Sequence, residues 1–398
     1  MGGTVLNQCV HAGFIEAVHS RKPVAGLSHG FYRYPARFSP LFARAAVKAF
    51  TSPGDLVFDP FAGGGTTLVE ASASGRRAIG TDINALAVFV AQVKTTVLSE
   101  VQLLEVRVWA HALLPDLNLH LPSSRATEWV EQGYHRNISG KATWPIRKTL
   151  ELAIARLTDL GTARQRRFAR CVLLRSAQWA LDCRKHIPSA AEFRRKFLVY
   201  LSEMEDGNRA YANAVQQHTH TGLRPLCLLR SAVGVESDPV LARQRPPTLV
   251  LTSPPYPGVH VLYHRWQIRG RRETPAPYWI ANGKDGSGTS FYTFGDRYEP
   301  GLPTYFDQLR ASFESIARIV NKDTMVVQMV AFPDPVWQLP QYLDVMQDAG
   351  FAETRIPVFA NSDDGRMWRC VPNRKWYADQ KGAIGSSKEV VLFHRLAR

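Results

Sequence analysis

A glycine-rich stretch in the first quarter of the chain combines backbone freedom with an acidic residue. Its sequence is Asp59-Pro60-Phe61-Ala62-Gly63-Gly64-Gly65-Thr66-Thr67. The apolar run 56–58 before it predicts a buried strand, and the composition of 68–71 after it predicts a helix. Because glycine has no Cβ, such a turn lets the backbone pass close to a ligand. A glycine cluster also occurs in ordinary strand-to-helix turns, so this stretch alone leaves both interpretations open.

A second acidic residue follows the glycines at a distance that suits a nucleoside. The apolar run 78–81 predicts another strand, and it ends at Asp82. A carboxylate about 20 positions past such a glycine turn can hydrogen-bond the ribose hydroxyls of a bound nucleoside. The alternative is an acidic residue on the surface with no ligand.

A third stretch places polar and aromatic groups at the end of another predicted strand. Residues 248–252 have a buried-strand pattern and run directly into Ser253-Pro254-Pro255-Tyr256. Two prolines end the strand ladder and fix a rigid turn. Tyr256 is therefore expected at the carboxyl edge of the sheet, where open α/β sheets bind their ligands.

The glycine-rich motif and the Ser-Pro-Pro-Tyr motif together resemble those of the S-adenosylmethionine-dependent amino-methyltransferases of DNA. These enzymes methylate N4 of cytosine or N6 of adenine. The resemblance implies an α/β fold, a Rossmann-like methyltransferase with a doubly wound mixed sheet and a large helical insertion. It also implies S-adenosylmethionine as the cofactor.

The same resemblance assigns roles to particular residues. Ser253, Pro254, Pro255 and Tyr256 form the catalytic set. The Ser253 hydroxyl and the Pro254 carbonyl accept the amine hydrogens, while the Tyr256 ring, rather than its hydroxyl, stacks on the base. The segment around Phe38 helps close the pocket around the methionine part of the cofactor. The cofactor-binding set is Tyr34, Pro35, Phe38, Ser39, Asp59, Pro60, Phe61, Ala62, Gly63, Gly65, Thr66, Thr67, Asp82 and Ile83.

The first residue of the catalytic motif bears on the choice of base. Serine there is more typical of N4-cytosine enzymes, and Asp or Asn is more typical of N6-adenine enzymes. We therefore predict a site-specific cytosine-N4 DNA methyltransferase of restriction-modification or genome defence. The alternatives are an N6-adenine DNA methyltransferase and an RNA amino-methyltransferase. Carbon-5 methylation is disfavoured, because that chemistry needs a Cys next to a Pro, and no Pro-Cys pair occurs in the chain.

Composition points to a polyanionic partner. The formal net charge is +15, which favours nucleic acid. We expect duplex DNA with the target base flipped out, and a cognate restriction endonuclease is a candidate second partner. The five cysteines are scattered, so neither a disulfide framework nor a zinc site is expected, and a cytoplasmic location with nucleoid association is predicted. No apolar run is long enough to span a membrane.

The order of strand-like and helix-like periodicity along the chain predicts that it is organised in three parts. Residues 1–98 would form the cofactor half of the core, 99–222 a helical insertion and candidate DNA-binding module, and 223–398 the catalytic half with a long loop over 257–302. Arginines and lysines concentrate between Arg164 and Lys196, which fits either phosphate contact or a solvated helix face. The loop mixes aromatic residues with arginine, as in a nucleic-acid groove or in a lid packed by its own rings.

Overall fold

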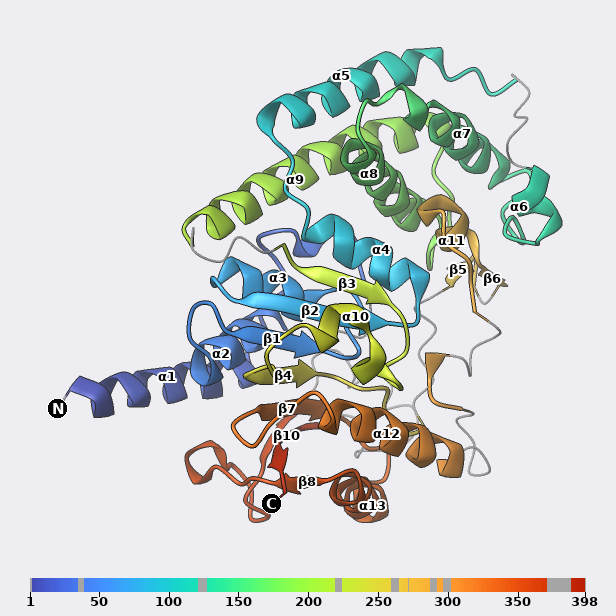
Figure 1. Cartoon of the computed structure of the whole chain (residues 1–398). Helices are drawn as coiled ribbons and strands as arrows, with labels where there is room; N and C mark the ends of the chain where they lie inside the picture. Colours follow the sequence, from blue (N-terminus) through green and yellow to red (C-terminus); the bar gives the residue numbers. More distant parts are fainter. Residues whose placement is uncertain are drawn as a thin grey trace.

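The chain folds around one central sheet that carries helices on both faces (Figure 1). The computed structural model describes residues 2–34, 39–120, 127–218, 224–258, 265–270, 272–286, 292–295, 302–370 and 388–397. Two residues of the predicted cofactor set, Pro35 and Phe38, lie outside these ranges.

Among the described residues the sheet has eight strands, and seven of them follow the order β3-β2-β1-β4-β7-β10-β8, with β9 pairing β10 as well. Strands β3, β2, β1, β4 and β7 pair in parallel, whereas β10 runs antiparallel to β7, β8 and β9. This arrangement confirms the prediction of a doubly wound mixed sheet. The strands are β1 (Leu56–Asp59), β2 (Arg77–Asp82), β3 (Leu226–Leu229), β4 (Leu249–Thr252), β7 (Met325–Val330), β8 (Phe351–Glu353), β9 (Met367–Cys370) and β10 (Lys388–Leu396).

Alternation along the strands divides the core between the two faces of the sheet. In β4, Leu249 and Leu251 pack in one cluster with Phe14 of α1 (Gly2–His19), whereas Val250 packs in the opposite cluster with Phe313 of α12 (Leu302–Ala317). This period of two is what a strand buried on both faces requires. The helices around the core sheet are α1 (Gly2–His19), α2 (Pro40–Phe50), α3 (Thr66–Ala73), α4 (Ala85–Lys94), α10 (Pro239–Ala242), α12 (Leu302–Ala317) and α13 (Pro335–Asp348), with single turns η1 (His29–Phe31), η3 (Val235–Ser237) and η6 (Pro357–Phe359).

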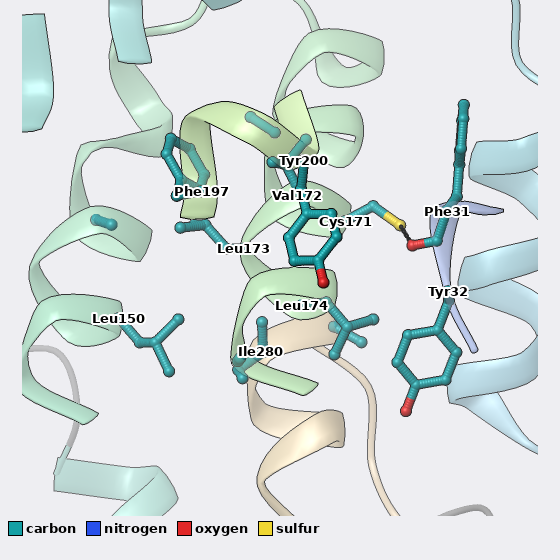
Figure 2. Packing of buried hydrophobic residues seen from close by; sticks show 14 of the residues in the cluster. Phe31, Tyr32, Leu150, Cys171, Val172, Leu173, Leu174, Phe197, Tyr200 and Ile280 are labelled. Carbon is teal, nitrogen blue, oxygen red and sulfur yellow. Dashed lines mark hydrogen bonds between the residues drawn. The ribbon is translucent and has the colours of Figure 1, made fainter. Parts of the chain in front are cut away.

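The predicted helical insertion follows α4 and leads back into β3 (Figure 1). Capping boxes at Ser99, Thr162 and Ser189 begin its three longest helices, because each cap and its partner satisfy free amides at the helix start. A single apolar cluster fills its interior (Figure 2). Its elements are α5 (Glu100–Asp116), α6 (Thr127–Glu131), α7 (Trp144–Ala155), η2 (Arg156–Asp159), α8 (Ala163–Leu181) and α9 (Ala190–Gln216).

The segment predicted as a long loop contains regular structure that packs against the insertion. It holds the hairpin β5 (Trp266–Ile268) and β6 (Arg272–Thr274), followed by α11 (Ala276–Ala281). Trp266, Tyr278 and Trp279 are buried in the apolar cluster of the insertion. These three rings therefore pack in a core shared with the insertion, rather than in one made by the segment's own rings. Sequence periodicity missed these elements because each is shorter than seven residues.

Several arginines of the basic run have internal partners. Arg166 donates to the Leu160 carbonyl at 2.7 Å, and Arg170 donates to the Ile280 carbonyl at 2.8 Å. Arg175 is buried, with its guanidinium 4.3 Å from the centroid of the Tyr200 ring. These groups hold the insertion together, so a phosphate-binding role for the whole run is not what their placement indicates.

Candidate functional site

The end of β1 and the end of β4 are tied together by a buried carboxylate. Asp59 Oδ1 accepts hydrogen bonds from the Thr252 hydroxyl at 2.7 Å and from the Phe61 amide at 3.1 Å. Burial raises the pKa of Asp59 to about 6, although hydrogen bonds to the carboxylate act in the opposite direction. A carboxylate kept in such a place at a cost in stability marks a candidate functional site.

Asp82, at the end of β2, closes the glycine loop. Its Oδ2 accepts from the Gly63 amide at 2.8 Å, and its Oδ1 accepts from the Asn84 amide at 2.8 Å. Burial raises the pKa of Asp82 to about 6, against these two backbone hydrogen bonds. The side chain nevertheless remains partly exposed. Each oxygen has room for a second donor, so the carboxylate can receive hydroxyls of a ligand.

The glycines of the loop are required by conformation and by close neighbours. Gly63 and Gly65 have φ of +48° and +75°. A Cβ on Gly65 would lie 2.8 Å from the Ala91 Cβ, and a Cβ on Gly64 would lie 3.1 Å from the Tyr34 Cβ. Tyr34 thus covers the loop closely. The fully buried Lys94 supports it from α4, since its Nζ donates to the Gly64 carbonyl at 2.8 Å.

Two threonines begin helix α3 directly after the glycines. Thr67 Oγ1 donates to the Leu251 carbonyl at 3.4 Å, which adds a second link between the loop and β4. Thr66 Oγ1 is buried and has no hydrogen-bond partner among the described residues. Buried hydroxyls in native proteins normally have a partner. A water molecule or a polar ligand beside the glycine loop could supply the partner of this hydroxyl.

The Ser-Pro-Pro-Tyr motif follows β4 without a gap, as predicted. Ser253 Oγ lies 3.0 Å from the Met329 carbonyl of β7 and 3.1 Å from the Tyr256 hydroxyl. A serine hydroxyl has one hydrogen and two lone pairs. When its hydrogen goes to the Met329 carbonyl, Ser253 keeps its lone pairs available to accept from an incoming amine.

The two prolines present their carbonyls differently. The Pro255 carbonyl accepts from the buried Tyr305 hydroxyl at 2.8 Å, which fixes the turn from α12. Within the described part of the chain, no donor reaches the Pro254 carbonyl. This difference leaves the Pro254 carbonyl as the acceptor that a ligand could use.

Behind the motif lies a buried ion pair that sequence patterns did not indicate. The Tyr256 hydroxyl donates to Glu389 Oε1 of β10 at 2.9 Å. Glu389 Oε2 accepts from Nε and Nη2 of Arg369, on β9, at 2.8 Å and 2.6 Å. Both charged side chains are nearly inaccessible, with 7% and 6% of their surface exposed. The available signal was an acidic residue directly before the apolar run 390–393.

The remaining members of the predicted cofactor set lie on three elements. Ile83 is partly buried against the apolar cluster of the insertion. Ser39 is the N-cap of α2, where its Oγ accepts from the Leu41 amide at 3.2 Å. Pro60 and Ala62 stand within the turn, and the Pro60 carbonyl accepts from the Thr81 hydroxyl at 2.9 Å. Their contact with a cofactor stays a prediction.

A basic cleft lies between the insertion and the β5–β6 hairpin. Its volume is about 360 Å³ and it is open to solvent. Three exposed cations line it, and none of them forms an ion pair within the described ranges. By contrast, the nearby Arg265 is paired with Asp285 at 2.9 Å. Figure 1 places the hairpin on the side of the sheet where β1 and β3 end. The residues around the cleft are Asn137, Gly140, Lys141, Ala142, Thr143, Ile268, Arg269 and Arg272.

Comparison with known families identifies the segment that contains the glycine loop. Residues 15–92 match the family described as DNA methylase. This segment is similar to the DNA methylase family. It includes the glycine loop and Asp82, whereas Ser253 and Tyr256 lie beyond the matched residues.

Two curated proteins are similar over parts of the chain. The type II methyltransferase M.MjaII of Methanocaldococcus jannaschii is 38% identical over 66 residues, which are 17% of this chain and 12% of that protein. The type II methyltransferase M.MvaI of Kocuria varians is 37% identical over 73 residues, or 18% of this chain and 16% of that protein. The alignments thus span less than a fifth of either relative.

Solved structures are similar at low sequence identity. The rRNA methyltransferase aviRa from Streptomyces viridochromogenes matches with a TM-score of 0.35 and 12% identity, over 92% of this chain and 89% of that one. TrmN from Thermus thermophilus matches with a TM-score of 0.32 and 12% identity, over 91% of this chain and 50% of that one.

The DNA amino-methyltransferases use S-adenosylmethionine, and the residues present fit this cofactor. Asp82 offers carboxylate oxygens for the ribose, the buried Thr66 hydroxyl has no partner among the residues that the structure describes, and the glycine loop leaves no side chain at its turn. No helix in the described ranges has the length and apolar character needed to cross a membrane.

Proposed function

We propose that the protein is a DNA amino-methyltransferase that methylates N4 of cytosine in duplex DNA. The observation that carries the proposal is the placement of Ser253 and Tyr256 at the carboxyl end of β4. In the sheet, β4 is the direct neighbour of β1, which ends at the glycine loop. A cofactor held by the loop and an amine held by Ser253 would therefore meet at one sheet edge.

The chemistry suits these residues. S-adenosylmethionine, when bound, supplies an activated methyl group. An exocyclic amine is a poor nucleophile because its lone pair is delocalised into the ring. Acceptors at both of its hydrogens favour a pyramidal nitrogen, and Ser253 Oγ with the Pro254 carbonyl provides them. Neither group is a strong base. The contribution of the protein is therefore mainly positioning, which can supply a large part of a barrier reduction.

The choice of cytosine rests on the serine that begins the motif, by the resemblance described above. Adenine N6 is the second candidate. The target amine is hidden in a duplex, so the base must be extruded before it can meet Ser253. The ring of Tyr256 would then stack on it. The exposed cations of the basic cleft are suited to the flanking phosphates.

The direct test is the identity of the methylated nucleoside. Purified protein is incubated with isotope-labelled S-adenosylmethionine and unmethylated genomic DNA, and in parallel with structured RNA. The nucleic acid is digested and the nucleosides are separated by mass spectrometry. We expect labelled N4-methylcytosine from DNA, and a loss of at least about 100-fold in Ser253→Ala. Labelled N6-methyladenine would move the assignment to adenine, and label in RNA alone would refute the proposal.

A further inference from the structure

The contacts behind the catalytic motif assign a positioning role to two residues far from it in sequence. We propose that Glu389, held by Arg369, fixes the Tyr256 ring and through it the Ser253 hydroxyl. This inference rests on the proposed function for its consequence in catalysis. The contacts themselves stand independently of that function.

The two oxygens of Glu389 have separate tasks. Oε2 accepts both hydrogen bonds from Arg369, and Oε1 accepts the one from the Tyr256 hydroxyl. Glu389 and Arg369 are also direct cross-strand partners in the β9–β10 pair, so the backbone ladder sets their distance. Arg369 Nη1 donates in addition to the Val18 carbonyl of α1 at 3.3 Å. The acceptor offered to Tyr256 is therefore held from three elements.

Burial makes this arrangement stiff. A charged pair inside a protein loses its hydration, and replacement by apolar residues is often neutral or stabilising. A contribution to stability alone therefore does not explain a buried ion pair at this position. The pair does, however, hold an acceptor in one place, and a hydrogen bond to a charged group is stronger than one between neutral groups.

The hydroxyl of Tyr256 transmits this placement to the catalytic serine. Its hydrogen goes to Glu389, so its oxygen can only accept from Ser253 Oγ at 3.1 Å. Ser253 is then restricted to donating toward Tyr256 or toward the Met329 carbonyl, and both directions leave a lone pair for the amine. The sequence predicted that only the ring of Tyr256 matters. The contacts give its hydroxyl a function as well.

A double-mutant cycle with Tyr256→Phe and Glu389→Gln tests the role. We expect each single change to lower kcat about 10-fold, with the KM for S-adenosylmethionine unchanged. The double variant should lose hardly more than Tyr256→Phe alone, because Glu389→Gln acts on the motif through the hydrogen bond that Tyr256→Phe removes. The matched control is Tyr305→Phe, which removes a buried hydroxyl from the Pro255 carbonyl. Its effect should be independent of Glu389→Gln, so the two losses should multiply.

The same cycle, measured by urea unfolding, needs no activity. Coupling between Tyr256→Phe and Glu389→Gln in stability shows the contact, and coupling in kcat shows its role in positioning. Independent effects in both measurements would overturn the inference. If Glu389→Gln does not fold, Arg369→Lys is used instead. Lysine keeps the positive charge but cannot donate from two nitrogens of one planar group to Glu389. A folded wild-type protein that methylates nothing refutes the proposed function, and the unfolding cycle then decides on the contact alone.

Discussion

Replacing Asp82 with Asn should weaken cofactor binding and stabilise the fold at neutral pH. The asparagine keeps one oxygen as an acceptor but removes the charge. The ribose hydroxyls lose a charge-assisted interaction worth about 1.5–3 kcal/mol, which corresponds to a loss in affinity of roughly 10- to 150-fold. A residue with a purely structural role would leave the affinity unchanged.

The stability effect follows from the raised pKa of this carboxyl group. Its pKa moves from 3.8 to about 6 on folding. The contribution of Asp82 to the free energy of unfolding is therefore fully present below pH 3.8, and it is lost as the pH rises through about 6. A shift of about 2 units corresponds to roughly 3 kcal/mol. We expect about half of this, because Asp82 is partly exposed and solvent screens its charge.

Two measurements check both effects. Calorimetric titration with S-adenosylmethionine gives the affinity, and urea unfolding between pH 4 and 8 gives the stability of each protein. The difference in unfolding free energy, Asp82→Asn minus wild type, should grow between pH 4 and about 7 and then level off. Because Asp59 is present in both proteins, most of its contribution to the pH dependence cancels in this difference. An unchanged affinity would exclude Asp82 from the site, and parallel pH profiles would refute the argument from burial.

Three further predictions concern other parts of the chain. His394 is buried with no partner for either ring nitrogen among the described residues, and burial lowers its pKa to about 4. Stability should therefore fall as the pH drops from about 6.5 to 4, by up to roughly 3 kcal/mol, and His394→Leu should remove this slope in acid unfolding curves. Gly65→Ala should lower the melting temperature by several degrees, because φ is +75° and its Cβ would lie 2.8 Å from Ala91; an unchanged melting temperature would contradict the strain. Replacing Lys141, Arg269 and Arg272 together with Gln should reduce the slope of log affinity against log salt for duplex DNA by up to about 3. The same change at the exposed Arg243, Arg245 and Lys322 is the matched control and should alter the slope little; equal effects would remove the cleft from the DNA-binding surface.

Local motifs were predictable because their geometry is set by a few consecutive residues. The strand, glycine turn and helix around Gly63 follow directly from composition, and so does the proline turn after β4. The insertion was visible as a change from sheet to helix periodicity. What sequence reasoning missed depends on contacts across long separations. Tyr256 and Glu389 are 133 positions apart, and nothing in either neighbourhood specifies the other.

Charge patterns were the weakest guide. The arginines of α8 formed the densest basic run in the sequence, yet Arg170 and Arg175 are used inside the protein. The cations of the cleft, in contrast, come from two segments far apart in the chain, Lys141 and the shorter arginine run 269–272. Density of charge along the chain does not indicate which side chains remain without a partner, because tertiary packing decides that.

The direction of β10 explains how the positioning pair reaches the site. Strands β1, β4 and β7 run in parallel, so their carboxyl ends, with the glycine loop and Ser253, share one edge. β10 runs antiparallel to β7, and Val390, near its start, pairs with Val330 at the end of β7. The beginning of β10 therefore lies at the same edge, and Glu389 faces Tyr256 there. If β10 ran parallel to β7, its first residues would lie at the opposite edge. The antiparallel strand is thus the feature of the fold that allows a late segment of the chain to position the catalytic motif.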